Sequence, residues 1–310
     1  MATTFTVSPV LYQGQAVQEY LLKCMRGNAT GNAGVRFIDS VKDKIIIKKL
    51  DAPLNMEHES CGYNPTGSIT SSGLQYSVFG YQDQSEICWK DIPQLFGSEN
   101  LTAGANNGSI DQVTDFAPAL IETKVKTNGE SVDNMLWNSV AATGGTITED
   151  FDGFIEILTN SGGNNITGTS ASAITTSNAL AVFGAVYAAA AENASCVLSK
   201  PVAEQAFFVS PKTAALYKLA NTLFINVGPL GAIVDKFLDV DIVAIPAIGD
   251  DIVIFGERKN FVILTDLWDD SSQVSILDEH EKYNYVVFTM RMKLGAGIGF
   301  PAEITTWGLA

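Results

Sequence analysis

The best candidate for a chemical site is a grouping of one histidine and two cysteines. His58 and Cys61 stand in the segment MEHESCG with the spacing His-x-x-Cys, and Cys88 follows 27 residues after Cys61. Closely spaced His and Cys side chains are typical ligands of tetrahedral zinc. A structural zinc site needs four ligands, usually in two tight pairs, and Cys88 has no close partner in the sequence. The three residues are therefore metal candidates, with free or half-buried side chains as the alternative interpretation.

Other motifs lack the surroundings that their chemistry would require. The tripeptide FDG at 151–153 superficially resembles the DFG tripeptide of protein kinases, but no kinase glycine-rich loop or catalytic loop accompanies it. The run 295–299 (GAGIG) lacks the Lys-Ser/Thr pair of a phosphate loop and leads to Pro301 instead of into a helix. The acidic pairs at 250–251 and 269–270 are typical of solvated turns, with cation binding as an alternative. We therefore expect no catalytic residue and no cofactor, and we do not expect an enzyme.

The composition is that of a folded, acidic protein with an uneven charge distribution. The 310 residues could hold about two domains and bury a sizeable core. The formal net charge is −15, yet residues 1–50 carry seven Lys/Arg against three Asp/Glu, a net charge of +4. A chain with so little clustered positive charge is not expected to coat nucleic acid with its whole surface. The four cysteines are too sparse for a disulfide scaffold, so we expect free thiols.

Neither a targeting segment nor a membrane span is predicted. The sequence opens with a polar, mixed stretch, and its longest apolar run, 179–191, is too short and too rich in alanine to cross a bilayer. We expect a protein that is synthesised in the cytoplasm and has no membrane association.

An extended hairpin is predicted in the first third of the chain, after a short helix over 13–26. Residues 42–50 (KDKIIIKKL) and 74–81 (LQYSVFGY) have the β-branched and alternating patterns of strands, and turn signals such as NPTGS lie between them. The stretch from Asp51 to Trp89 contains no Lys or Arg. Two strands with so little apolar mass would not fold alone, so we expect a partner surface such as a neighbouring copy.

The middle of the chain is predicted to be mainly helical. Residues 85–96 favour a short helix, and 115–143 favour a long helix with one apolar stripe. A polar tract up to residue 172 predicts a surface loop, and a capped, alanine-rich helix is expected over 175–193. A buried strand at 206–209 precedes a helix that begins at Ser210-Pro211, since serine caps helices well and proline suits the first turn.

The last third of the chain is predicted to be mostly β-structure. Strand-like runs separated by polar turns occur at 225–227, 242–246, 252–255, 261–264, 274–277 and 283–294. In the last run Phe288 and Met290 share one face, whereas Thr289 and Arg291 share the other.

The order of these elements resembles that of the Hong Kong 97 (HK97) family of tailed-phage major capsid proteins over nearly the whole chain. Residues 207–219 (FFVSPKTAALYKL) resemble the family's strand-then-helix signature. Residues 242–264 resemble its run of strand, proline, Gly-Asp, strand, glycine and strand. The segment 291–304 (RMKLGAGIGFPAEI) is similar to the family's ending, where a basic strand gives way to glycine and then proline-alanine.

The resemblance implies an α+β HK97-like capsid fold built from four regions. These are an N-terminal arm (1–40), an extended β-hairpin loop (41–85), a peripheral domain with a long spine helix (86–222) and a mainly axial, β-rich domain (223–310). The C-terminal strand is expected to return to the peripheral domain.

The resemblance also implies a structural function. Copies would assemble into the hexamers and pentamers of an icosahedral head that encloses double-stranded DNA without sequence-specific binding. Portal, separate scaffolding and decoration proteins are the further partners implied, and the subunit would reside in the virion after synthesis in the host bacterial cytoplasm. Some relatives cross-link through a lysine on the extended loop, but no lysine lies between Lys49 and Lys90, so we do not expect this chemistry at the loop tip.

Three alternatives are kept open. An encapsulin-like nanocompartment shell protein shares the fold but encloses enzyme cargo. A β-rich surface adhesin is suggested by the Asn/Thr/Gly loops, although the central helices argue against it. A metal-dependent enzyme at His58, Cys61 and Cys88 is the third.

Overall fold

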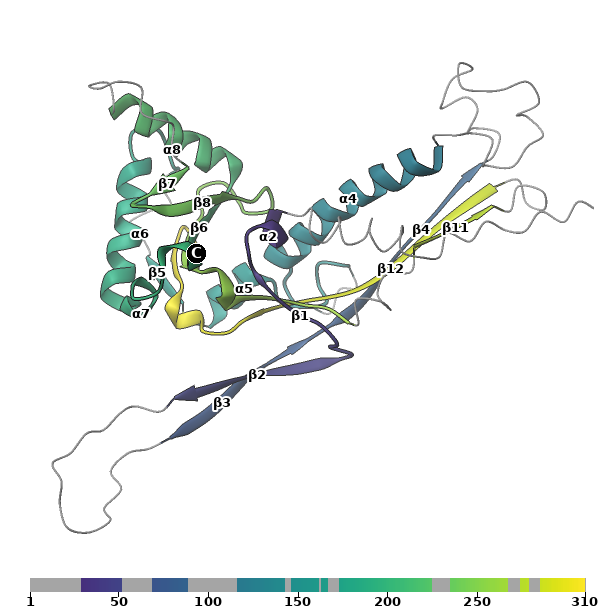
Figure 1. Ribbon diagram of the computed structural model, residues 1–310, viewed down its shortest axis with the longest axis horizontal. Coiled ribbons are helices and arrows are strands. Elements are labelled where there is room, and N and C mark those ends of the chain that lie inside the picture. Colours follow the sequence, from purple (N-terminus) through teal and green to yellow (C-terminus); the bar gives the residue numbers. More distant parts are fainter. Residues whose placement is uncertain are drawn as a thin grey trace, which may run out of the picture.

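The computed structural model describes residues 29–51, 69–88, 116–142, 146–161, 163–166, 173–224, 235–266, 274–278 and 285–309. These residues form three β-sheets together with α-helices and short 3₁₀ helices. Figure 1 shows a body from which two extended limbs leave in different directions. One limb is a two-stranded hairpin, and the other combines a long helix with a ribbon of strands.

The central sheet of the body has the strand order β5-β13-β9-β6-β8-β7. Its strands are β5 (Asn164–Ile166), β6 (Gln205–Val209), β7 (Lys236–Phe237), β8 (Val240–Ala244), β9 (Val253–Glu257) and β13 (Thr305–Trp307). Every residue of β6 is buried, because each face of the sheet has its own hydrophobic core. Phe207 and Val209 point to one core, and Ala206 and Phe208 point to the other. Strands covered on both faces have continuous apolar sequences, as residues 206–209 (AFFV) of β6 do.

Helices cover one face of this sheet and complete the first core. They are α6 (Ala179–Asn193), α7 (Ser195–Leu198) and α8 (Pro211–Phe224). The core joins Phe183 of α6 and Tyr217 of α8 to Phe207 and Phe255 of the sheet. The predicted start of α8 is confirmed, since the Thr213 backbone N–H donates to the Ser210 hydroxyl oxygen at 3.2 Å.

The second core contains a cluster of aromatic rings beneath the long helix α4 (Phe116–Asn138). The Trp137 ring lies 5.1 Å from Phe154, 5.8 Å from Phe208 and 5.8 Å from Phe261. Phe154 begins α5 (Phe154–Asn160), and Phe261 begins β10 (Phe261–Leu264). These rings therefore join the long helix to the central sheet through Phe208 and to the five-stranded sheet through Phe261.

A five-stranded sheet connects the body to the ribbon. Its path is β1-β10-β12-β11, and β4 also pairs with β12; the remaining bounds are β1 (Arg36–Ile38), β4 (Phe79–Cys88), β11 (Val274–Asp278) and β12 (Tyr285–Ile298). The fourteen-residue β12 pairs with β10 through residues 295–298 and with β4 through residues 285–294. The predicted alternation is confirmed, because Phe288 and Met290 are buried and Arg291 is exposed.

The hairpin consists of β2 (Lys44–Asp51) and β3 (Thr70–Ser77), in a register that pairs Lys44 with Ser77 and Asp51 with Thr70. Val78 separates β3 from β4, and its backbone N–H donates to the Asp43 carbonyl oxygen at 2.8 Å. The extended stretch 70–88 is therefore divided at Val78 between the two-stranded sheet and the five-stranded sheet. Figure 1 shows β2 and β3 leaving this junction on the side opposite to the β4–β12 ribbon.

Short segments complete the described chain. These are the helix α2 (Ala29–Asn32) and the 3₁₀ helices η5 (Val202–Glu204), η6 (Arg258–Asn260) and η7 (Pro301–Glu303). No described helix is both long and apolar enough to span a bilayer.

Two local predictions are wrong. Residues 85–88 are not the start of a helix but the end of β4, where Ser85 pairs with Phe288 and Cys88 with Tyr285. The long-range ladder with β12 overrides the local helical pattern there. The polar tract expected to be only a surface loop contains β5, which pairs in parallel with β13. The predicted helix at 13–26, the strand at 225–227 and residues 89–96 lie outside the described residues.

The expected boundary near residue 222 does not separate the two hydrophobic cores. Helices α6 and α8, which precede that boundary, pack on the same sheet as β8 and β9, which follow it. This part of the body is therefore a layer of helices on a sheet, because β6 supplies a central strand to strands that come later in the chain.

Substitution of two neighbouring phenylalanines should distinguish the two cores. Phe207→Leu and Phe208→Leu are each expected to lower the free energy of unfolding by about 1–2 kcal/mol. Hydrogen exchange should increase in α6 and α8 for Phe207→Leu, but in α4 and α5 for Phe208→Leu. The same exchange pattern in both variants would contradict the assignment of separate cores.

Candidate assembly surfaces

The predicted metal candidates are not brought together in the described part of the chain. Cys88 is exposed at the end of β4, whereas His58 and Cys61 lie outside the described residues. Among the described residues no group of three His, Cys, Asp or Glu side chains has the proximity that a metal ion needs. Cys196, at the start of α7, is also an exposed free thiol.

Two other motifs have structural contacts that explain them. Asp152 accepts a hydrogen bond from the Ala141 backbone N–H at 2.8 Å, which fixes the turn between α4 and α5. Asp250 accepts from the Ser210 hydroxyl at 3.0 Å and pairs with the Lys212 ammonium at 3.1 Å. The hydrogen bond from Lys212 lowers the pKa of Asp250. The acidic pair at 269–270 lies outside the described residues.

The β2–β3 hairpin has one face toward the body and one toward solvent. Ile45 and Ile47 are half-buried against Val41, Val78, Val262 and Leu264. On the opposite face Lys44 and Lys48 are exposed, and Ile46 between them is 56% exposed. Ile69, just before β3, is 76% exposed. Because this solvent face combines lysines with large apolar side chains, it is suited to cover by another protein surface.

The ribbon and the long helix form the second candidate surface. The Lys124 ammonium of α4 lies 3.0 Å from Asp83 Oδ2 and 2.6 Å from Ser85 Oγ, both on β4. It also lies 5.6 Å from the centre of the Phe288 ring on β12. These contacts hold the helix along the ribbon, so that the limb projects from the body as one unit (Figure 1).

A buried carboxylate anchors the short helix α2, the first described segment of the chain. Asp133 of α4 is only 5% exposed and accepts hydrogen bonds from the backbone N–H groups of Ala29, at 2.9 Å, and Thr30, at 3.3 Å. The Trp137 indole N–H donates to the Thr30 hydroxyl at 2.8 Å. Burial raises the pKa of Asp133, and the hydrogen bonds from α2 partly oppose this rise. The long helix therefore fixes the position of α2.

Sequence reasoning missed this anchor, although a signal was present. Asp133 interrupts the apolar stripe of the long helix between Val132 and Met135, both of which are buried. An acidic residue on a buried helix face needs hydrogen-bond donors from elsewhere in the chain. The sequence does not indicate which segment supplies them, because Thr30 is more than a hundred residues away.

Comparison with known proteins identifies the fold. No protein-family model and no curated protein sequence matches the chain. A chain of the satellite phage P4 procapsid, solved with its size determination protein, matches with a TM-score of 0.61 and 13% identity over 99% of this chain and 93% of that chain. The capsid of Myoviridae phage XM1 gives a TM-score of 0.55 at 14% identity, covering 89% and 90% of the two chains.

A particle that is not described as a phage head matches comparably. The virus-like particle from Pyrococcus furiosus gives a TM-score of 0.54 at 11% identity, covering 94% of this chain and 97% of that chain. At such low identities the similarity establishes the fold alone. The predicted fold class is confirmed: the chain has an α+β, HK97-like capsid fold.

The anchor at Asp133 predicts a defined pH dependence of stability. Because its folded pKa is raised, the folded chain binds more protons than the unfolded chain between about pH 4 and the raised pKa. The stability contributed by this carboxyl should be largest in acid and should fall as the pH rises through that window.

Asp133→Asn, which cannot ionise, tests this sign. Urea unfolding from pH 4 to pH 7 should show the variant gaining stability relative to the natural chain as the pH rises. A relative loss of stability over the same range would contradict the role of burial. Asp133→Ala, which removes the acceptor altogether, should cost about 0.5–2 kcal/mol at pH 4 and less as the pH rises.

Proposed function

We propose that this chain is a structural shell subunit, the major capsid protein of a tailed phage, and not an enzyme. The observation that carries the proposal is the β2–β3 hairpin, which leaves the body with Ile46 and Ile69 open to solvent. A two-stranded hairpin is marginally stable in water by itself. Contact with a neighbouring subunit would bury these side chains and would give the hairpin a function.

The geometry supports a closed assembly in which every copy has the same role. The β2–β3 hairpin and the helix-and-ribbon limb point in different directions (Figure 1). A projecting element that contacts a different surface on the next copy makes a head-to-tail interface, and such interfaces form rings when the rotation closes. Hexamers and pentamers of an icosahedral head are rings of this kind.

The charge of the chain supports enclosure of DNA without specific binding. The net charge of −15 makes the wall repel phosphate overall, so packed double-stranded DNA would not adhere to it. The subunit would be synthesised in the host bacterial cytoplasm and would reside in the virion. Portal, separate scaffolding and decoration proteins are further proposed partners.

A nanocompartment shell protein that encloses enzyme cargo is the second candidate function. The match to the Pyrococcus furiosus virus-like particle favours keeping it, because its TM-score is close to that of the phage XM1 capsid. The contents of the particle distinguish the two candidates.

Electron microscopy of particles purified from infected or expressing cells tests the proposal. We expect closed icosahedral shells or ring-shaped capsomers, and particles from infected cells should contain nuclease-protected double-stranded DNA. Particles that hold a defined enzyme and no genome would instead support the nanocompartment. A chain that stays monomeric under varied salt, pH and concentration would contradict both.

The exposed lysines of the hairpin predict an electrostatic contribution to assembly. Because residues 51–310 are strongly acidic, Lys44→Glu/Lys48→Glu should slow shell assembly at about 50 mM salt, and about 0.5 M salt should largely remove the difference. Light scattering and electron microscopy measure the effect. A matched control, Lys212→Glu/Lys259→Glu, makes the same change in net charge on two exposed lysines of the body. Equal behaviour of the two variants would show that the position of the charge is irrelevant.

A further inference from the structure

The glycine run 295–299 lies against the end of the hairpin that joins the body, at Tyr76 and Ser77 of β3. A Cβ atom added at Gly295 would stand 2.5 Å from the Ser77 carbonyl oxygen, and one at Gly297 would stand 2.9 Å from the Tyr76 ring. Both distances are shorter than non-bonded atoms tolerate. The Tyr76 hydroxyl also donates to the Ile298 carbonyl oxygen at 2.7 Å. Because Gly295 and Gly297 of β12 have no side chains, β3 can pack directly against them. We call these two residues the glycine track.

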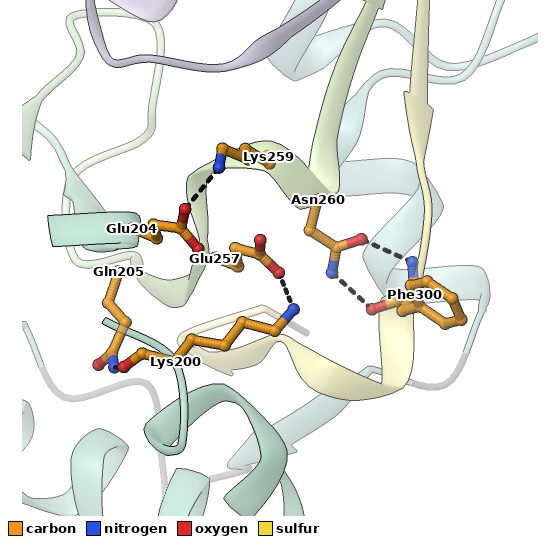
Figure 2. Close-up of polar contacts among 7 residues, drawn as sticks. All are labelled: Lys200, Glu204, Gln205, Glu257, Lys259, Asn260 and Phe300. Atoms are coloured by element: carbon orange, nitrogen blue, oxygen red, sulfur yellow. Dashed lines mark hydrogen bonds and ion pairs between the residues drawn. The ribbon is translucent and has the colours of Figure 1, made fainter. Parts of the chain in front are cut away.

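Phe300, which follows the glycine run, is held by two hydrogen bonds to the side chain of Asn260. Asn260 is only 5% exposed, and its side-chain amide donates to the Phe300 carbonyl oxygen at 2.8 Å. Its side-chain oxygen accepts from the Phe300 backbone N–H at 2.6 Å. Figure 2 shows the two hydrogen bonds side by side, with the carboxamide facing the backbone of Phe300. The Asn260 carboxamide thus makes the same pair of hydrogen bonds to the Phe300 backbone that the backbone of a neighbouring strand would make.

The Phe300 ring then contacts the other strand of the hairpin. The Lys49 ammonium of β2 lies 5.1 Å from the centre of the ring, within the range of a cation–π interaction. Burial lowers the pKa of Lys49, and the nearby Glu303 carboxylate opposes this change. Lys49 lies on the face of β2 opposite to Lys44 and Lys48, so it serves the chain's own body while those two lysines face solvent.

We propose that Gly295, Gly297 and Phe300 form a seat that sets the direction of the β2–β3 hairpin, with Asn260 and Lys49 as its positioning residues. The consequence for assembly rests on the proposed shell function. A hairpin whose direction is already fixed can contact a neighbouring subunit without first becoming ordered. Without the seat, each subunit would have to order its hairpin during assembly and would associate more slowly.

Hydrogen exchange of the complete, unassembled chain tests the seat directly. Lys49→Met keeps the aliphatic stem but removes the charge, and Phe300→Leu removes the ring. Each should increase exchange of the hairpin amides at 45–50 and 71–77 about twofold to fivefold, the change expected from loss of an exposed cation–π pair. Exchange in β6 and β9 should not change. Lys49→Arg and Phe300→Tyr retain the cation and the ring and should restore protection.

The glycine track is tested by a second variant with a matched control. Gly297→Ala should increase hairpin exchange more than Lys49→Met does, because its methyl group would meet the Tyr76 ring. Gly184→Ala in α6 is the control, since a Cβ there has no neighbour within 4 Å. Unchanged hairpin exchange in both Lys49→Met and Gly297→Ala would overturn the proposal, as would an equal increase in hairpin and body.

Assembly kinetics separate this inference from the proposed function. If the natural chain assembles, Lys49→Met should prolong the lag before shells appear and Lys49→Arg should not. If the natural chain never assembles while hairpin exchange follows the expected pattern, the seat stands and the shell function fails. If shells form normally but hairpin exchange is unchanged in every variant, the seat fails and the shell function stands.

Discussion

A two-stranded hairpin buries too little apolar surface to hold a fixed position in water by itself. The β2–β3 hairpin of this chain meets that constraint at its root, where Ile45 and Ile47 pack on Val262 and Leu264. Its outer face, with Ile46 exposed between two lysines, has no such cover among the described residues. We propose that another copy completes this face, and the rest of the fold provides a rigid base for that contact.

The rigid base comes from strands that are buried on both faces. β6 directs Phe207 into the core under α6 and α8, and Phe208 into the core under α4. Because one strand contributes to both cores, the body and the long helix cannot shift relative to each other without opening close-packed contacts. Trp137 strengthens the connection, since its ring contacts Phe208 and Phe261 while its indole N–H holds Thr30.

Sequence reasoning predicted the elements whose signals are local. Serine-capped α8, the buried strand β6 and the alternating β12 have strong periodicity or capping patterns, and the structure contains them near the predicted positions. The end of β4 was predicted as a helix because the ladder that makes it a strand comes from residues 285–288, about two hundred positions later. The order of elements was enough to identify the fold, but the grouping of α6 and α8 with β8 and β9 depends on packing that no local pattern encodes.

The candidate surfaces were predictable only in part. The lysine-flanked isoleucines of β2 indicated an exposed strand, and Ile46 is indeed 56% exposed. The glycine run at 295–299 fits no nucleotide-binding pattern, and its steric role depends on Tyr76 and Ser77, which are distant in sequence and lie against it. His58 and Cys61 lie outside the described residues, so the metal candidates stay a prediction from sequence.

Cross-linking of mixed-isotope particles tests the central claim most directly. Shells assembled from equal amounts of ¹⁴N and ¹⁵N subunits can be treated with a lysine-reactive cross-linker and analysed by mass spectrometry. If the hairpin completes a neighbouring copy, cross-links from Lys44 and Lys48 should join light to heavy chains as often as they join chains of the same label. Cross-links from these lysines that stay within chains of one label would contradict a subunit completed by its neighbour.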